Sequence, residues 1–212
     1  MIFEKKIEQM IQGLKDKGIS DERVLQAMRK VPRHYFVAPG LEFQAYDEKA
    51  LPIGFGQTIS HPYTVALMTQ VLNPQKGERI LEIGTGSGYQ AAVLCALGAT
   101  VFSIEKIREL AVRAERRLKQ LGYGYQVLIR IGDGSLGWAA HAPYDAIIFT
   151  AGAPQVPKHL FDQLKIGGRL LIPIGDKEEQ TLTMFVKDKE KVVQKTIRKL
   201  RFVPLKGAHG WQ

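Results

Sequence analysis

Three glycines, at positions 84, 86 and 88, alternate with small hydroxyl residues near the middle of the chain. A mostly apolar segment of strand length (80–83) precedes them, and an Ala/Leu-rich helical pattern (89–97) follows. A strand, a glycine-rich turn and a helix in this order are typical of a nucleotide-binding crevice, where backbone N–H groups meet the positive end of a helix. A dinucleotide site would have its third glycine where Tyr89 stands, so the spacing argues against a pyrophosphate-binding turn.

An acidic residue follows the next predicted strand. Glu105 comes directly after the apolar segment 100–104, 21 residues beyond Gly84. A carboxylate at the tip of a second parallel strand faces the ligand crevice and can accept hydrogen bonds from both hydroxyls of a ribose. The alternative is an acid that only stabilises the start of the following helix. We favour the ribose interpretation.

A second acid, Asp133, follows the third predicted strand and is flanked by Gly132 and Gly134. Its carboxylate can accept a hydrogen bond from an adenine amino group, and the backbone amide of Gly134 can serve a ring nitrogen. The alternative is an ordinary Asp-Gly turn. A glycine loop and two acids at the ends of three successive strands together predict a site for an adenosine-containing ligand.

The elements that must position these residues alternate between strand and helix. This alternation predicts an α/β fold, a doubly wound, mostly parallel, Rossmann-like seven-stranded sheet with helices on both faces. After Gly175 the pattern changes, and segments 182–186 and 192–202 predict an antiparallel strand pair at the sheet edge. The expected strands are 80–83, 100–104, 126–131, 144–150 and 169–174, and the expected helices between them are 89–97, 107–121 and 159–164.

The N-terminal part is expected to cap this sheet. Amphipathic patterns predict helices over 2–17 and 21–31, the second capped by Ser20. Pro62 suits the first turn of a third helix, 62–72, after a loop that places Ser60 or His61 at the cap position. We therefore expect one domain over 1–212, made of a cap and substrate lid (1–75), a cofactor-binding core (76–175) and C-terminal strands with a substrate-binding tail (176–212).

The formal charge of +9 is concentrated partly in residues 187–206, which hold eight Lys or Arg against two acids. Such a segment could attract nucleic acid. We favour a solvated face on edge strands, where lysines discourage edge-to-edge pairing. A nucleic-acid-binding module would interleave aromatic residues with the basic ones, and this segment has only Phe202. We therefore expect no nucleic-acid partner.

We expect a cytoplasmic monomer without a metal or a membrane partner, although composition does not fix the oligomeric state. The longest apolar runs fall far short of the roughly 20 residues that span a bilayer, and residues 1–6 lack the apolar block of a signal peptide. The single cysteine, Cys95, excludes an intrachain disulfide and suits a reducing cytosol. It falls within a predicted helix, where a buried thiol is favoured over a nucleophile. The histidines at 34, 141, 159 and 209 lack metal-ligand spacing.

The glycine loop with Glu105 and Asp133 resembles class I S-adenosylmethionine-dependent methyltransferases. Over about residues 20–206 the chain further resembles the protein-L-isoaspartate (D-aspartate) O-methyltransferase family. That resemblance implies methyl transfer from S-adenosyl-L-methionine, leaving S-adenosyl-L-homocysteine, to the free α-carboxylate of L-isoaspartyl residues in damaged proteins, which initiates repair via a succinimide. Activity on D-aspartyl residues is left open by the sequence. The segments that carry it are 31–37, 56–62, 142–148 and 201–205, with Tyr46; Glu at 105 and His at 61 are minor departures.

The resemblance also implies which residues form the site. Two of the substrate-binding assignments given below have a structural alternative. His61 could only pack beside Pro62, and residues 203–205 could only pack along the last strand. The implied cofactor-binding residues are Thr58, Ile59, Ser60, Gly84, Thr85, Gly86, Glu105, Lys106, Asp133 and Gly134. The implied substrate-binding residues are Ser60, His61, Val203, Pro204 and Leu205.

The implied chemistry needs neither a general base nor a metal. An α-carboxylate with a pKa of roughly 3.5 is ionised at pH 7, and a sulfonium methyl is already electrophilic. Catalysis then comes from in-line positioning and partial desolvation. We interpret Ser60 as a hydrogen-bond donor that holds the attacking carboxylate, with helix capping as the alternative.

A same-fold methyltransferase acting on RNA or a small molecule is the competing hypothesis. Amino-methylating enzymes use an Asn/Asp-Pro-Pro-aromatic run after the fourth strand. Residues 150–154, at that place in this chain, are Thr-Ala-Gly-Ala-Pro. The absence of the Asn/Asp-Pro-Pro-aromatic run argues against this competing hypothesis.

Overall fold

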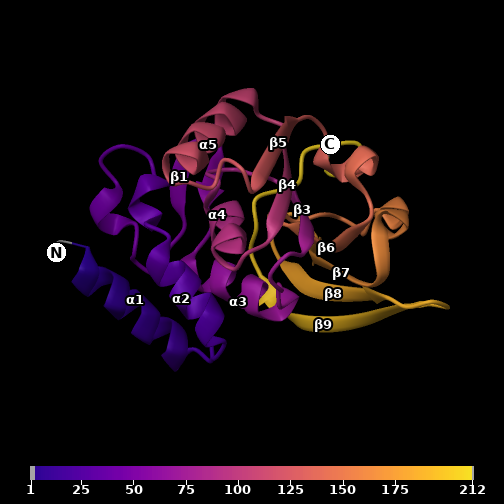
Figure 1. The fold of residues 1–212 in the computed structure, drawn as a ribbon, viewed down its shortest axis with the longest axis horizontal. Coiled ribbons are helices and arrows are strands. Elements are labelled where there is room, and N and C mark those ends of the chain that lie inside the picture. Colours follow the sequence, from indigo (N-terminus) through magenta and orange to yellow (C-terminus); the bar gives the residue numbers. More distant parts are fainter. Residues whose placement is uncertain (1–2, 212) are drawn as a thin grey trace.

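The computed structural model of the chain describes residues 3–211 (Figure 1). The predicted helices are present with ends shifted by one or two residues, except that position 2 of the first lies outside the described residues. Apolar positions at helical spacing predicted the first three α-helices, and an Ala/Leu-rich composition predicted the fourth. The α-helices are α1 (Glu4–Asp16), α2 (Glu22–Lys30), α3 (Pro62–Leu72), α4 (Tyr89–Ala96) and α5 (Arg108–Gln120).

One mixed sheet forms the centre of the molecule. Its strands are β3 (Arg79–Ile83), β4 (Thr100–Glu105), β5 (Val127–Ile131), β6 (Tyr144–Phe149), β7 (Leu164–Gly175), β8 (Gln180–Lys187) and β9 (Val192–Leu200). Their order is β5-β4-β3-β6-β7-β8-β9. The strands from β5 to β7 pair in parallel, and β8 is antiparallel to both of its neighbours. The predicted parallel sheet with an antiparallel C-terminal part is therefore confirmed.

The strand order reverses beside β3. The chain runs from β3 outward to β4 and β5, and then returns to place β6 on the other side of β3. In open α/β sheets, ligands bind outside the carboxyl ends of the strands at such a point. The fold thus directs the search for a site to the loops that follow β3, β4 and β6.

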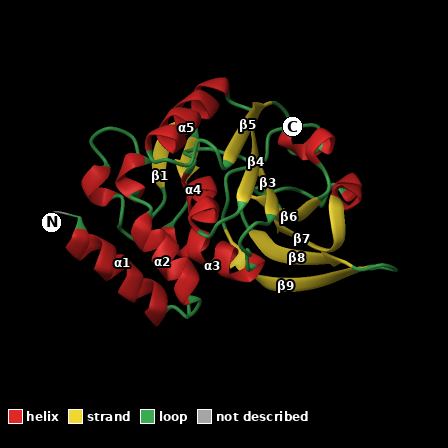
Figure 2. Ribbon diagram, viewed as in Figure 1, coloured by secondary structure: helices red, strands yellow, loops and turns green. Residues whose placement is uncertain are grey.

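The α-helices gather on one face of the sheet (Figure 2), although α-helices were expected on both faces. One hydrophobic cluster contains residues from α1 through β8, so the N-terminal cap and the sheet share a core. The opposite face is covered by short 3-10 turns and the C-terminal segment, whose Leu160 and Leu205 pack in a cluster with Leu81 and Ile147. The helix expected at 159–164 is thus a 3-10 helix, Lys158–Gln163. The other 3-10 turns are Arg33–Tyr35, Glu42–Gln44, Gly134–Leu136 and Ala139–His141.

Two local predictions were wrong. The loop expected before helix 62–72 instead contains an antiparallel hairpin of β1 (Leu51–Gly54) and β2 (Gln57–Ile59). Its turn carries three successive positive φ angles, at Gly54, Phe55 and Gly56, which the two glycines accommodate. Helix α2 is capped by Asp21, whose carboxylate accepts a hydrogen bond from the Arg23 amide at 2.9 Å, and not by Ser20.

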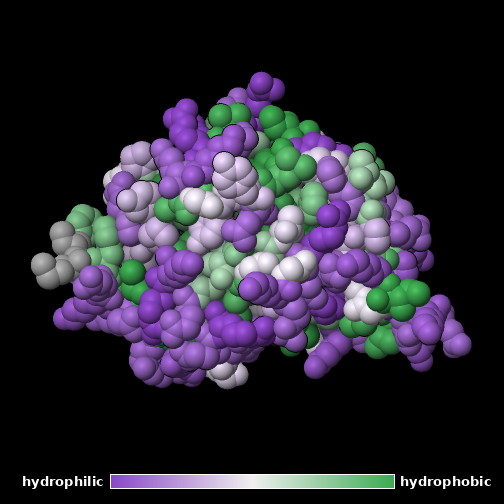
Figure 3. All heavy atoms as spheres, in the orientation of Figure 1, coloured by the Kyte–Doolittle hydropathy of each residue, from purple (hydrophilic) through white to green (hydrophobic). Residues whose placement is uncertain are grey.

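Hydrophilic and hydrophobic residues cover different parts of the surface. Figure 3 shows hydrophilic residues over α1 and α2, and hydrophobic residues over the β5 end of the sheet, where Leu128 and Ile131 are exposed. No helix within residues 3–211 is long and apolar enough to cross a membrane. Nor does this part of the chain bring together three or more His, Cys, Asp or Glu side chains that could hold a metal ion.

Candidate active site

The glycine loop after β3 is fixed by its neighbours in the sheet. The Gly84 amide donates to the Ile104 carbonyl at 2.9 Å, and the Thr150 hydroxyl, at the end of β6, donates to the Gly84 carbonyl. Gly84 has a φ of +98°, and a Cβ there would lie 2.4 Å from Thr150 Oγ1. Only glycine therefore fits this turn, because any side chain would meet both steric and conformational strain.

Glu105, at the end of β4, is joined to the same loop. Its Oε2 accepts a hydrogen bond from the Gly86 amide at 2.8 Å, and its Oε1 accepts one from the Ile107 amide at 2.9 Å. The residue is only 6% exposed. Each carboxylate oxygen can accept more than one hydrogen bond, so the acid is held rigidly and still has acceptor capacity toward the cavity.

The first hydroxyl of the loop anchors it in the core. Thr85 Oγ1 shares a hydrogen bond with Ser103 Oγ, and Ser103 Oγ donates to the buried Glu82 carboxyl. Burial raises the pKa of Glu82 to about 8. At neutral pH this carboxyl is mostly protonated, which lets a fully buried acid occupy the sheet without an ionic partner.

The β1–β2 hairpin forms the opposite wall of a cavity above the loop. Thr58, Ile59 and Ser60 from the hairpin line the same cavity as Glu105 and residues 84–86. Ile53 of β1 lies close to the loop, since a Cβ on Gly86 would be 3.6 Å from its Cδ1. The hairpin therefore stands where a lid over a ligand on the loop would stand.

A third wall comes from the C-terminal segment 203–205. The Gly152 amide donates to the Val203 carbonyl at 2.9 Å, and the Leu205 amide donates to the Gly152 carbonyl at 2.8 Å. Val203, Pro204 and Leu205 all line the cavity. Both of these hydrogen bonds lie on the edge of the segment that faces Gly152. Because successive carbonyls of an extended chain point to opposite edges, the Pro204 carbonyl points to the other edge.

Asp133 lies beside the cavity but is not among the described residues that line it, whereas Gly134 is. Its Oδ1 accepts from the Ser135 amide at 2.9 Å, and its Oδ2 accepts from the Ala208 amide at 2.7 Å. Burial acts to raise the pKa of Asp133. The Ser135 hydroxyl, which donates to Oδ1 at 2.6 Å, outweighs it together with the two amides and the Lys106 charge, and the pKa lies below its ordinary value. The structure thus ties this acid to the chain's own C-terminal segment.

His61 faces away from the cavity. Its Nδ1 accepts a hydrogen bond from the Tyr63 amide at 3.2 Å and so caps α3. It lies in a separate groove with Lys17, Tyr63 and Arg198, and burial lowers its pKa. Because His61 supplies the cap, the capping alternative for Ser60 was wrong.

The structure brings most of the predicted site residues into one cavity. Thr58 to Ser60, Gly84 to Gly86, Glu105, Lys106, Gly134 and Val203 to Leu205 all line it; Asp133 and His61 do not. Sequence reasoning missed several lining side chains. Tyr89 was considered as the place of an absent glycine and the start of a helix, and Thr150 as the end of a strand and part of the 150–154 run, but neither was considered as a lining residue. The missed lining residues include Gln57, Val65, Met68, Ser87, Tyr89, Gln90, Thr150 and Ala151.

A glycine turn after the first strand of a mixed seven-stranded sheet, joined to an acid at the end of the second, is the arrangement expected of a class I S-adenosylmethionine-dependent methyltransferase, and a solved structure of that class shares the fold. The protein-L-isoaspartate (D-aspartate) O-methyltransferase family model matches residues 5–210. The chain therefore belongs to this family.

Individual proteins agree with that assignment. The chain is 51% identical to protein-L-isoaspartate O-methyltransferase 1 of Syntrophobacter fumaroxidans, over 99% of this chain and 98% of the relative. It is 47% identical to the Dictyoglomus thermophilum protein-L-isoaspartate O-methyltransferase, over 99% and 95%. A solved protein-L-isoaspartate O-methyltransferase structure superposes with a TM-score of 0.85 at 32% identity, covering 96% of this chain and 67% of the other. The fold is also shared with a Plasmodium falciparum structure solved with S-adenosyl-L-homocysteine (TM-score 0.81, 24% identity, 93% and 97% covered).

Proposed function

We infer that this cavity carries out the reaction of its family. It transfers a methyl group from S-adenosyl-L-methionine to the free α-carboxylate of an L-isoaspartyl residue in a damaged protein, which initiates repair via a succinimide. One observation supports this most strongly: Ser60 and the 84–86 loop with its fixed acid form facing walls of a single cavity. A hydroxyl donor for a carboxylate thus stands opposite the place for an adenosyl ligand.

The residues of this chain fit the cofactor. The Glu105 carboxylate, held by two backbone amides, accepts from ribose hydroxyls, and the glycine loop leaves its main chain open to close contact. Gly134 supplies a backbone wall for the adenine, and Thr85, Lys106, Thr58 and Ile59 complete the cavity. The cofactor, when bound, supplies an electrophilic sulfonium methyl group. For the adenine amino group we propose Asp133, which lies beside the cavity and keeps acceptor capacity beyond its hydrogen bonds from Ser135 and Ala208.

On the substrate side, Ser60 donates a hydrogen bond to the ionised α-carboxylate and holds one oxygen toward the methyl group. Val203, Pro204 and Leu205 form the wall along which the peptide lies, with the Pro204 carbonyl available for a substrate amide. The hairpin excludes water from the carboxylate, which removes part of its hydration and makes it a better nucleophile. His61 contacts the peptide farther from the reacting atoms, in its separate groove.

We also propose that the enzyme is a cytoplasmic monomer of one domain, without nucleic-acid or membrane partners. The three walls of the cavity are complete within one chain. The free, buried Cys95 fits a reducing compartment. Light scattering during size-exclusion chromatography tests the monomer, because a stable dimer would elute with twice the 23.7 kDa mass.

A paired-peptide assay tests the function. The enzyme is given radiolabelled S-adenosyl-L-methionine with a peptide containing one isoaspartyl residue, and, separately, with the same peptide containing normal aspartate. We expect base-labile label on the isoaspartyl peptide only, because a carboxyl methyl ester hydrolyses in mild base. Label that appears equally on both peptides, or on neither, would contradict the proposal. Base-stable label on added RNA would favour the competing methyltransferase class.

A further inference from the structure

Arg33 is a completely buried cation placed directly behind the lid. It follows α2 in a 3-10 turn and is 0% exposed. Its Nε donates to the Ala45 carbonyl at 2.6 Å, and its Nη2 donates to the Ser60 carbonyl at 2.7 Å. One guanidinium therefore joins the N-terminal cap to the residue that ends the hairpin.

Burying the Arg33 charge costs the folded protein free energy. Burial lowers the pKa of Arg33 to about 10, so it remains charged at neutral pH. None of the ion pairs in the described part of the chain includes it, and its Nη1 is buried without a hydrogen-bond partner there. A buried charge without an anion costs free energy that well-packed apolar side chains do not. Packing alone therefore does not account for an arginine at this position.

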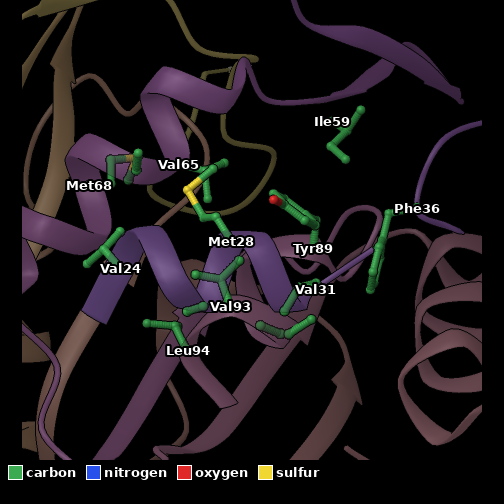
Figure 4. Packing of buried hydrophobic residues seen from close by; sticks show 14 of the residues in the cluster. Val24, Met28, Val31, Phe36, Ile59, Val65, Met68, Tyr89, Val93 and Leu94 are labelled. Atoms are coloured by element: carbon green, nitrogen blue, oxygen red, sulfur yellow. The ribbon is translucent and has the colours of Figure 1, made fainter. Parts of the chain in front are cut away.

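The guanidinium also contacts a second wall of the cavity. Its Cζ lies 4.8 Å from the centre of the Tyr89 ring, within cation–π range. Tyr89 lines the cavity at the start of α4, and its ring is held edge-on by Phe36 at 5.5 Å between centroids (Figure 4). Arg33 thus touches two lining residues, Ser60 and Tyr89, from behind.

We propose that Arg33 is a positioning residue that fixes the direction of the Ser60 hydroxyl. This inference rests on the proposed role of Ser60 as the donor to the substrate carboxylate. Ser60 stands between the last residue of β2 and the cap of α3, where neither element supplies a regular backbone hydrogen bond to its carbonyl. The Arg33 fork holds that carbonyl, and the Ala45 carbonyl and the Tyr89 ring hold the fork. Lysine cannot reproduce this geometry, because a single ammonium group lacks the planar pair of donors.

A double-mutant cycle tests the proposal with a readout that a structural role alone would not move. The kcat and KM for an isoaspartyl peptide are measured for wild type, Arg33→Lys, Ser60→Ala and the double variant. S-adenosyl-L-homocysteine affinity and thermal unfolding are recorded for each. Arg29→Lys is the matched control: Arg29 lies on α2, pairs with Glu8 at the surface and does not line the cavity.

We expect Arg33→Lys to lower kcat/KM by about ten- to a hundredfold, the scale of a misplaced catalytic contact, while affinity for S-adenosyl-L-homocysteine stays within about threefold. In the Ser60→Ala background, the same change should alter kcat/KM by less than about threefold, because residues that act through one group are not additive. Arg29→Lys should match wild type.

Three outcomes would overturn the proposal. Equal losses from Arg33→Lys in both backgrounds would show a general structural effect, and wild-type kinetics for Arg33→Lys would show no effect. Full activity of Ser60→Ala would remove the role of Ser60 and with it this inference, without touching the family reaction. If Arg33→Lys does not fold, Arg33→Gln takes its place in the same cycle, since its amide can still donate to one carbonyl and leaves no charge to bury.

Discussion

Glu105 Oε2 and the Gly86 amide are joined by a 2.8 Å hydrogen bond, although they lie 19 residues apart, one at the end of β4 and the other in the loop after β3. The bond makes the glycine loop and the acid a single unit, because neither can shift without the other. A ligand that contacts both therefore meets a preformed surface and loses little free energy to ordering the protein.

Glu105→Ala should weaken S-adenosyl-L-homocysteine binding by about 1–3 kcal/mol, the usual cost of losing a charged hydrogen-bond partner. The loss has two parts, the missing contact to the ribose and the released Gly86 amide. Isothermal titration calorimetry measures it, with Glu109→Ala, an exposed position in the first turn of α5, as the control. An unchanged dissociation constant for Glu105→Ala would count against the ribose role.

Gly84→Ala should be more damaging than an alanine at another glycine with the same backbone angle. Gly122 is the matched control, because its φ is +84° and a Cβ there meets nothing within 4 Å, whereas Gly84 has a φ of +98°. Both variants should lose about 1–2 kcal/mol of unfolding free energy from the left-handed conformation. Gly84→Ala should lose more, because its methyl group would lie 2.4 Å from Thr150 Oγ1.

Urea denaturation and S-adenosyl-L-homocysteine titration measure both effects for the two glycines. In a Thr150→Ala background the additional loss at Gly84 should shrink, because the clashing hydroxyl is gone. Equal losses for Gly84→Ala and Gly122→Ala would mean that Thr150 moves aside without cost, and that the close packing of the loop is not required.

The strands and α-helices of the core could be predicted from the sequence because their patterns are local. Alternating apolar segments and glycines placed β3, α4 and β4 within about two residues of their positions. The acid after β4 was found for the same reason, since the end of a parallel strand fixes the edge of the sheet on which it lies. The hairpin escaped detection because its strands are short and its turn includes Phe55 at a φ of +56°, which no residue pattern announces.

The contacts made at long range could not be predicted. A charged residue after a surface helix is ordinarily exposed, and nothing near Arg33 in the sequence indicates that residues 45 and 60 supply its acceptors. Asp133 was recognised from its place after a strand, but its bond to the Ala208 amide depends on how the C-terminal segment folds back across 75 residues. Such pairings are decided by the whole fold.

The stability of the protein should depend on pH through Glu82. The pKa of Glu82 in the folded protein, about 8, lies above the ordinary 4.5. The stability that this carboxyl contributes to the folded protein is therefore fully present below pH 4.5 and is lost as pH rises through 8. Between these values the unfolded carboxyl ionises while the folded one keeps its proton, which reduces stability by up to about 1.4 kcal/mol per pH unit. Glu82→Gln cannot titrate and should escape this loss.

Denaturant unfolding at pH 5 and pH 8 measures the effect. The unfolding free energy of Glu82→Gln minus that of wild type should be about 2–4 kcal/mol larger at pH 8 than at pH 5, because only wild type loses stability over this range. Glu109→Gln, at an exposed position, should show no comparable change. A difference between Glu82→Gln and wild type that stays constant with pH would mean that Glu82 is ionised in the folded protein.

Ser60→Ala separates a role in positioning substrate from a role in the fold. The Tyr63 amide at the start of α3 is already bonded to His61 Nδ1, and the Ser60 backbone carbonyl that Arg33 holds is retained in the variant. Thermal unfolding and S-adenosyl-L-homocysteine affinity should therefore stay close to wild type. The kcat for an isoaspartyl peptide should fall by about ten- to a hundredfold, because the carboxylate loses the donor that aims it at the methyl group. A lowered Tm with unchanged kcat would assign Ser60 to the fold and leave the substrate carboxylate to be held by backbone groups alone.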